Sequence, residues 1–281
     1  MRVPVFYMPE QSSAAATGYS PSAGKPAQVV ADWLKTPDIA CQIAIRSFEQ
    51  VSPTLLSTVH SPSYVQGVLE GREKNGFGTR DLNVAKSLPY TAGSMWAAAK
   101  YVVDNGGVAV SPTSGFHHAH YECGGGFCTF NALAMTALNV KRRVLILDFD
   151  QHYGDGTEAI LEKLDKDNVV THITAGKSYD TADEALALLQ KLLDRTTDEE
   201  FGLVLYQAGA DIHIDDPLGG RMTTKEMQRR DALVFQLAAE RRLPLVWCLA
   251  GGYQRDKNGG IEPVLALHRQ TMVECLKVSG V

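Results

Sequence analysis

Two aspartates and one histidine follow separate apolar runs of the chain, at points where parallel strands would end. Asp150 and His152 come shortly after the run at 144–147, and Asp211 comes after the run at 203–206. Residues two apart in a strand point to the same face of a sheet, so Asp150 and His152 are expected to converge. Three protein ligands that leave one position open are typical of catalytic zinc. The sequence therefore predicts a site for one Zn²⁺ per chain.

An alternative interpretation applies to Asp150 and His152 taken alone. Asp150 would cap a helix and His152 would be a hydrogen-bonded histidine of the core, because short motifs give many false matches. The other strand ends favour the metal site, since they carry further groups that can do chemistry.

Two adjacent histidines, His117 and His118, stand between a strand candidate and a glycine run. Beside a metal ion, two imidazoles can divide the handling of protons, one as a base and the other as an electrostatic or acid partner. Each imidazole needs a carboxylate that fixes its tautomer. Asp148 and Asp155 flank the metal-ligand pair and are the candidates, although aspartate is also common in turns.

Tyr253 follows two glycines at the end of the apolar run at 245–249. Its hydroxyl would donate a hydrogen bond to an oxyanion and help to polarise a carbonyl. The alternative is a tyrosine that only packs on a glycine-rich turn. The run Gly124-Gly125-Gly126 lets the backbone approach a ligand closely. It lacks the Gly-Lys-Ser/Thr sequence that would make it a phosphate-binding loop.

These side chains need a scaffold that brings several strand ends together. Apolar, β-branched runs alternate with helix-forming segments, which predicts an α/β fold with a mainly parallel sheet and helices on both faces. The expected strands cover residues 3–7, 107–110, 144–148, 169–173, 203–206 and 245–249. The expected helices cover residues 91–103, 132–140, 157–164, 183–193 and 224–241. Ligands of such sheets bind beyond the carboxyl ends of the strands, where the candidate residues fall.

Length and composition are those of a globular protein. The chain has 281 residues, of which 44% are hydrophobic and 21% charged, and a net charge of −5. That charge argues against non-specific nucleic-acid binding, and five scattered cysteines do not make a disulfide framework. The sequence shows neither a secretory signal nor an apolar run that could span a membrane. We therefore expect a cytoplasmic protein without nucleic-acid or membrane partners, with residues 1–281 forming one domain.

Five motifs, in this order, resemble the histone deacetylase and acetylpolyamine amidohydrolase family. They are H-H-A at 117, G-G-F-C-x-F-N at 125, D-x-D-x-H-x-G-D-G at 148, Q-x-G-A-D followed by D-P-L-G at 207–219, and G-G-Y at 251. The resemblance implies the arginase–deacetylase fold. It also implies zinc-dependent hydrolysis of an N-acyl, typically N-acetyl, amide of an acyl-lysine or acylated amine, which releases acetate and a free amine.

The resemblance implies a role for each matched residue besides the three zinc ligands. His118, paired with Asp155, would be the main general base. His117, paired with Asp148, would tune the charge and orient the attacking water. Tyr253 would stabilise the oxyanion of the tetrahedral intermediate.

The resemblance also implies features around the substrate and beneath the site. Phe127 would form one wall of an acyl tunnel, and the carbonyl of Gly126 would accept the substrate amide N–H. A potassium ion would lie near Asp148 and the backbone of the metal-ligand pair, with its remaining ligands from around His172.

The sequence departs from the family pattern at three places. Ala250-Gly251-Gly252, before Tyr253, stands where the family has a run of three glycines. Tyr153 stands where the family has a second histidine. The long loop that carries the opposite aromatic wall of the tunnel in the family is reduced here to residues 175–180. We therefore expect a site that is wider or shallower than in typical relatives. The lone histidines His60, His120 and His268 lack a partner pattern and are interpreted as non-catalytic.

Two other functions are weighed against deacetylation. An arginase-like ureohydrolase with two manganese ions would need extra bridging carboxylates, which the sequence does not offer beside His152 or Asp211. A non-catalytic protein that binds acylated ligands would not need the full set of candidate catalytic groups. Oligomeric state and the identity of the substrate stay open.

Overall fold

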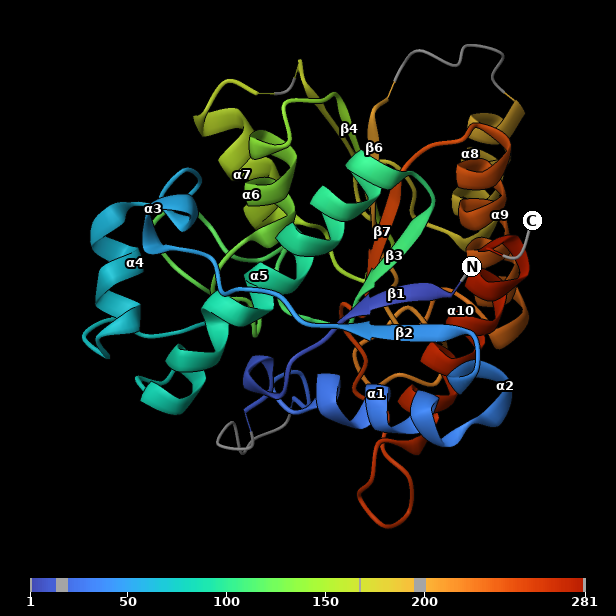
Figure 1. The fold of residues 1–281 in the computed structure, drawn as a ribbon, viewed down its shortest axis with the longest axis horizontal. Helices are drawn as coiled ribbons and strands as arrows, with labels where there is room; N and C mark the ends of the chain where they lie inside the picture. Colours follow the sequence, from blue (N-terminus) through green and yellow to red (C-terminus); the bar gives the residue numbers. More distant parts are fainter. Residues whose placement is uncertain (1, 14–19, 167, 195–200, 280–281) are drawn as a thin grey trace.

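Seven strands form one sheet in which every hydrogen-bonded pair runs parallel (Figure 1). The structure is a computed structural model that describes residues 2–13, 20–166, 168–194 and 201–279. The strands are β1 (Val3–Phe6), β2 (Ile43–Arg46), β3 (Val108–Ser111), β4 (Val144–Asp148), β5 (Val170–Thr174), β6 (Leu203–Gln207) and β7 (Leu245–Cys248). Their order across the sheet is β2-β1-β3-β7-β6-β4-β5.

Helices cover both faces of this sheet, which confirms the predicted fold class. One face carries α3 (Pro53–Leu56), α4 (Pro62–Leu69), α5 (Leu82–Asn105), α6 (Ala132–Asn139) and α7 (Asp155–Lys163). The other carries α1 (Lys25–Lys35), α2 (Pro37–Ala40), α8 (Ala182–Asp194), α9 (Thr224–Glu240) and α10 (Glu262–Ser279). A short 3₁₀ helix, η1, spans Pro9–Gln11. In Figure 1 the first group lies to the left of the sheet and the second group to the right or below it.

The two faces hold separate hydrophobic cores because successive strand residues point in opposite directions. Leu145 and Leu147 of β4 pack in the core shared with α1, α8, α9 and α10, whereas Val144 and Ile146 pack in the core shared with α4 to α7. All five residues of β4 are buried. This two-sided burial explains why the central strands are continuous apolar runs rather than alternating patterns.

The sequence predicted six strands and missed β2. β2 is an edge strand in which only Ile43 is buried, so it lacks the apolar run that marks the central strands. The predicted helix at 91–103 belongs to a longer helix, α5, which begins at Leu82 and contains Pro89. Proline usually marks a helix boundary, and the prediction therefore started too late. None of the helices in the described part of the chain has the length and hydropathy needed to cross a membrane.

Candidate metal and catalytic centre

Asp150 and His152 lie in the loop after β4, which ends at Asp148. The sequence analysis placed them on a strand, so the predicted reason for their convergence is wrong although they do converge. The loop turns back on itself, because both the backbone N–H and Nδ1 of His152 lie 3.0 Å from Oδ1 of Asp150. Asp211 follows β6, the strand next to β4, and its Oδ2 lies 3.3 Å from Nδ1 of His152.

These three side chains form a group of ligand atoms within 4.8 Å of one another. Asp150 and Asp211 are buried, and two buried carboxylates so close together repel each other. Burial and the charge of Asp150 raise the pKa of Asp211 to about 7. Hydrogen bonds to both carboxylates raise the pKa of His152 to about 10. The group therefore favours a positive charge at its centre.

The residues fit a divalent cation. Oδ2 of Asp211 is buried and, beyond the 3.3 Å approach of Nδ1 of His152, itself a candidate ligand, has no hydrogen-bond partner within the described residues. Gly251 leaves this side open, because a Cβ at that position would lie 2.2 Å from Oδ2 of Asp211 and 2.8 Å from Oδ2 of Asp150. Two carboxylates and one imidazole form a set of ligands that zinc commonly binds. The backbone N–H of Gly251 donates a hydrogen bond to Oδ2 of Asp150 at 2.9 Å and so helps to orient this carboxylate.

His117 is buried beside this group and bonded to Asp148. Its Nδ1 lies 2.9 Å from Oδ2 of Asp148, and its Nε2 lies 3.6 Å from Oδ1 of Asp150. Burial lowers the pKa of His117, but the charges of Asp148 and Asp150 outweigh this effect and raise it to about 9. Asp148 is held in turn by the side-chain amide of Gln207, which donates to Oδ1 at 2.7 Å.

His118 forms a second and more open pair with Asp155, the first residue of α7. Its Nδ1 lies 2.6 Å from Oδ1 of Asp155, and its ring centre lies 4.0 Å from that of His117. Burial and the neighbouring His117 lower the pKa of His118, which favours the neutral imidazole. His120 also reaches Asp155, at 3.3 Å. The sequence analysis gave His120 no partner, and the structure brings it to the edge of this pair.

Tyr253 lies on the turn after β7, with its ring centre 5.7 Å from that of Phe127. Its backbone N–H donates to Oδ2 of Asp216 at 2.7 Å, and burial raises the pKa of its hydroxyl above the ordinary value. The hydroxyl therefore stays protonated at neutral pH. Ala250, at the start of the turn, has a φ of 50°.

A buried lysine, Lys25 of α1, donates a hydrogen bond to the backbone of this turn. Its Nζ donates to the carbonyl of Ala250 at 2.5 Å, and its side chain is fully buried. Burial lowers the pKa of Lys25 to about 8, against the raising effect of Asp211 and Asp150. The first helix of the chain is thereby tied to the turn that carries Tyr253.

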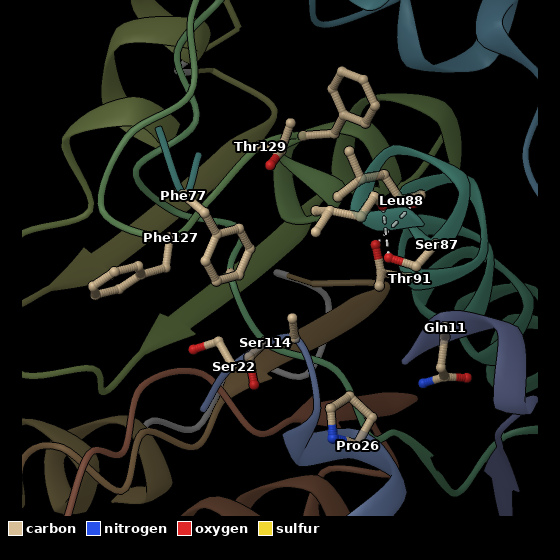
Figure 2. Close-up of a pocket in the computed structure, with 14 residues that line it drawn as sticks. Gln11, Ser22, Pro26, Phe77, Ser87, Leu88, Thr91, Ser114, Phe127 and Thr129 are labelled. Carbon is tan, nitrogen blue, oxygen red and sulfur yellow. Dashed lines mark hydrogen bonds between the residues drawn. The ribbon is translucent and has the colours of Figure 1, made fainter. Parts of the chain in front are cut away.

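Phe127 has a φ of 65° and directly follows Gly126. Gly126 has a φ of 51°, and a Cβ there would lie 2.5 Å from the ring of His118, so only glycine fits. Phe77, from the loop between α4 and α5, packs 5.8 Å from Phe127, with the ring planes 44° apart. Both rings line a small cavity, and Figure 2 shows them among the residues around it. The volume of the cavity is about 20 Å³. That volume holds little more than one water molecule, so the cavity is no substrate pocket.

The short segment after β5, residues 175–180, does not place an aromatic ring beside Phe127. Its aromatic residue, Tyr179, is buried and stacks on Phe149, with ring centres 5.2 Å apart. Tyr153, which follows the metal ligand His152, is 43% exposed and lies against Gly176 of the same segment. Residues 175–180 therefore place no ring beside Phe127, whose described ring neighbours, Phe77 and Tyr253, are tilted by 44° and 48°. The wider or shallower site stays a prediction.

The sequence analysis missed several residues that the structure places at the centre. Lys25 and Phe77 lie far from the motifs in the chain, and no local pattern marks them. Gln207 and Asp216 were part of the quoted motifs without a role, so the motif itself was the signal that could have found them.

Comparisons with known proteins agree with this arrangement. A family model described as the histone deacetylase domain matches residues 21–179 and 172–262. An uncharacterized protein of Picosynechococcus is 28% identical over 243 residues, covering 76% of this chain and 80% of that protein. Histone deacetylase 2 of Arabidopsis thaliana is 31% identical over 204 residues, covering 63% of this chain and 52% of that protein, so this chain spans about half of its length.

A solved structure shares the fold over nearly the whole chain. It is an acetylpolyamine aminohydrolase from Burkholderia pseudomallei, with a TM-score of 0.74 and 19% sequence identity, and the match covers 97% of this chain and 98% of that one. At this identity the likeness concerns the architecture: a parallel sheet with helices on both faces.

Proposed function

Because the chain belongs to the histone deacetylase family, as the matched family model shows, we propose that it hydrolyses an N-acyl amide to a carboxylic acid and a free amine. The observation that carries this proposal is the convergence of Asp150, His152 and Asp211 beside two oriented histidines. Residues 1–281 would act as one catalytic domain. The acyl group is an acetyl group, and the ion is one Zn²⁺ per chain.

Asp150, His152 and Asp211 would hold the ion. When bound, the ion would act as a Lewis acid on the acyl carbonyl and lower the pKa of the attacking water. The buried Asp211 oxygen, which beyond the nearby ring of His152 has no partner among the described residues, and the space left by Gly251 support this assignment.

Proton transfer falls to His118. It is oriented by Asp155, it is neutral because its pKa is lowered, and it is the more accessible of the two histidines. A neutral imidazole takes the proton of water as its oxygen attacks the carbonyl, and the protonated histidine then donates to the leaving amine. His117, held by Asp148, orients the water and contributes positive charge.

The hydroxyl of Tyr253 donates a hydrogen bond to the oxyanion of the tetrahedral intermediate. That hydroxyl stays protonated because burial raises its pKa, and its turn is fixed by Asp216 and Lys25. A donor placed before the reaction starts stabilises the developing charge without reorganisation. The carbonyl of Gly126 would accept the substrate amide N–H beside the ring of Phe127.

The substrate is an acylated amine or acyl-lysine that is not confined to a slot between two parallel rings. Tyr179 is turned into the core, and Tyr153 is exposed at the rim in place of the expected opposite wall. This arrangement favours a wider entrance than the family pattern implies. The similar chain from Burkholderia pseudomallei is named for acetylpolyamines and the one from Arabidopsis thaliana for histones, so both classes belong in the first screen.

A dinuclear manganese ureohydrolase is disfavoured. Among the described residues, Asp150, His152 and Asp211 are the one group of three or more metal-type side chains close enough to share an ion. Two ions per chain in a metal analysis would restore this alternative.

The test is a screen of the zinc-loaded protein against acetyl-lysine peptides, acetylpolyamines and small acetamides, with released acetate as the readout. Hydrolysis of at least one class is expected, with loss on chelation and recovery on addition of one equivalent of Zn²⁺. A protein that binds one Zn²⁺ and hydrolyses none of these substrates would contradict the proposal.

Tyr253→Phe is the matched variant for the mechanism, because it removes one hydroxyl and keeps the ring. The loss of an oxyanion donor lowers kcat by roughly 10²–10³-fold. An unchanged kcat in this variant, at an unchanged zinc content, would contradict the role of Tyr253.

A further inference from the structure

A line of charged and titratable side chains runs from His117 through Asp148 to the surface. Nε2 of His172 lies 3.4 Å from Oδ2 of Asp148, the same oxygen that meets His117. Nδ1 of His172 lies 2.8 Å from Oε1 of Glu158, and Nζ of Lys177 lies 2.5 Å from the other oxygen of Glu158. The proposed mechanism does not use His172, Glu158 or Lys177.

His172 sits between two carboxylates. Its side chain is 1% exposed, and each ring nitrogen faces one carboxylate oxygen. A neutral imidazole has one N–H and satisfies one acceptor, whereas the imidazolium donates to both. The geometry therefore places a buried positive charge beside Asp148.

The resemblance predicted a potassium ion at this place, and the residues do not fit one. Potassium is held by a ring of oxygens that replace its water shell. The carbonyl of Asp148 accepts a hydrogen bond from the hydroxyl of Tyr179 at 3.0 Å. Oδ1 of Asp148 accepts from Gln207 at 2.7 Å and from the backbone of Asp150 at 3.2 Å. The hydroxyl of Thr174, opposite Asp148 in β5, accepts a backbone N–H at 2.9 Å.

We propose that His172 takes the place of the potassium ion. It is a positioning residue that fixes Asp148, and through Asp148 the ring of His117, so that the protein needs no monovalent cation. The effect on rate rests on the proposed function, whereas the absence of a potassium requirement for folding does not.

The short segment after β5 explains how this replacement arises. Residues 175–180 turn tightly, with Ala175 bridged to Tyr179. The turn folds Tyr179 inward onto Phe149 and brings its hydroxyl to the carbonyl of Asp148. The shortening that removes a tunnel wall at the surface thus also supplies a hydrogen-bond donor beneath the site.

The first test measures thermal unfolding of the full chain, with its zinc, in KCl and in choline chloride at equal ionic strength. The melting temperatures are expected to agree within about 1 °C, because an ion stabilises a protein only by binding its folded state. A rise of roughly 5 °C or more that KCl produces and choline chloride does not would overturn the inference. This readout needs no substrate.

The second test follows the His117–Asp148 hydrogen bond by proton NMR of histidine-labelled protein. His172→Ala is expected to shift or abolish the downfield resonance of the His117 Nδ1 proton. Glu158→Gln is expected to shift it less, and this variant keeps the outer shape of the site if the alanine variant fails to fold. His60→Ala, which changes another buried histidine outside this line, serves as the control and leaves the resonance in place.

Kinetics supply the third readout. Losing an outer partner of this kind lowers kcat of His172→Ala by roughly 10–100-fold, with KM changed less than about twofold. For the wild type, replacing KCl by choline chloride leaves kcat unchanged. A His117 resonance unaffected in both His172→Ala and Glu158→Gln would overturn the positioning role. A protein with no hydrolase activity would overturn the proposed function, and the melting and NMR results would still decide the role of His172.

Discussion

The two histidine–aspartate pairs, His117–Asp148 and His118–Asp155, make the same kind of hydrogen bond between Nδ1 and a carboxylate oxygen. They differ in their surroundings. The side chains of His117 and Asp148 are 4% and 0% exposed, whereas those of His118 and Asp155 are 21% and 45% exposed. Asp148 has further partners in Gln207 and His172, while Asp155 stands at the start of a helix with His120 at its edge. Burial and the extra partners of Asp148 favour a His117 imidazole that keeps a fixed charge. The imidazole of His118 is more exposed and its carboxylate has fewer partners, which favours the exchange of a proton. The comparison therefore supports the proposed division, with proton transfer by the open pair and orientation by the buried one.

The sharpest test of this division is His118→Asn. If the open pair moves the proton, kcat falls by roughly 10³-fold, because a general base contributes about 10²–10⁴-fold. The free energy of unfolding changes by less than about 0.5 kcal/mol, as for most partly exposed positions. Steady-state kinetics and urea unfolding check both statements. A kcat reduced less than tenfold would show that His118 is not the base.

His117→Asn is expected to lower kcat less, by about 10²-fold, and to cost more stability. The substitution leaves the buried carboxylate of Asp148 without one charged partner, which lowers the free energy of unfolding by roughly 1–3 kcal/mol. The same two measurements apply. The division between the pairs would be reversed if His117→Asn were the more inactive and the more stable of the two variants.

Asp155→Asn is expected to lower the plateau rate by about tenfold and to move the acid limb of the pH–rate profile. The bond and the charge of Asp155 raise the pKa of His118, against the lowering effects of burial and His117. Without Asp155 the pKa of His118 falls further, so the acid limb of kcat/KM moves to lower pH. A limb that moves to higher pH, or stays in place, would contradict the pairing.

His60 is a buried histidine outside both pairs, and it serves as the reference with which His117 and His118 are compared. Its Nδ1 lies 2.8 Å from the carbonyl of His120, its Nε2 accepts from the backbone of Asn131 at 2.8 Å, and burial lowers its pKa to about 4. In the unfolded chain His60 becomes protonated below its ordinary pKa of about 6.5. In the folded chain it stays neutral until the pH falls to about 4. His60 therefore makes the stability fall by up to roughly 3 kcal/mol as the pH drops through this window.

His60→Gln is expected to leave kcat at pH 8 within about twofold of the wild type and to remove this slope. Urea unfolding of the two proteins at several pH values between 4 and 7 measures the difference. An equal slope in both proteins would show that His60 takes up its proton in the folded state.

The sequence predicted the central strands because the cause of their pattern is local, and it singled out polar residues that the structure brings together. β4 and β6 are buried on both sides, so their apolar runs stand out. The polar groups that follow them meet because parallel strands end at one edge of the sheet. The edge strand β2 carried no such run. The start of α5 was missed because Pro89 normally ends a helix, and here the helix continues through it.

The features that escaped prediction depend on contacts between distant parts of the chain. Lys25 meets the carbonyl of Ala250 across 225 positions of the sequence. Phe77 reaches Phe127 from a loop with no motif of its own. The proposed role of His172 in place of potassium rests on the positions of Tyr179 and Glu158, which the spacing of residues 158–179 does not reveal.

The bond from Lys25 to Ala250 also bears on how the protein is made. α1 leaves the ribosome well before its partner, because 225 positions of the sequence separate Lys25 from Ala250. Until then the ammonium group of Lys25 has no carbonyl to receive it, and burying it alone would cost several kcal/mol. The region around α1 is therefore expected to stay open to solvent during synthesis until the turn after β7 has emerged, and the candidate centre to close only after that.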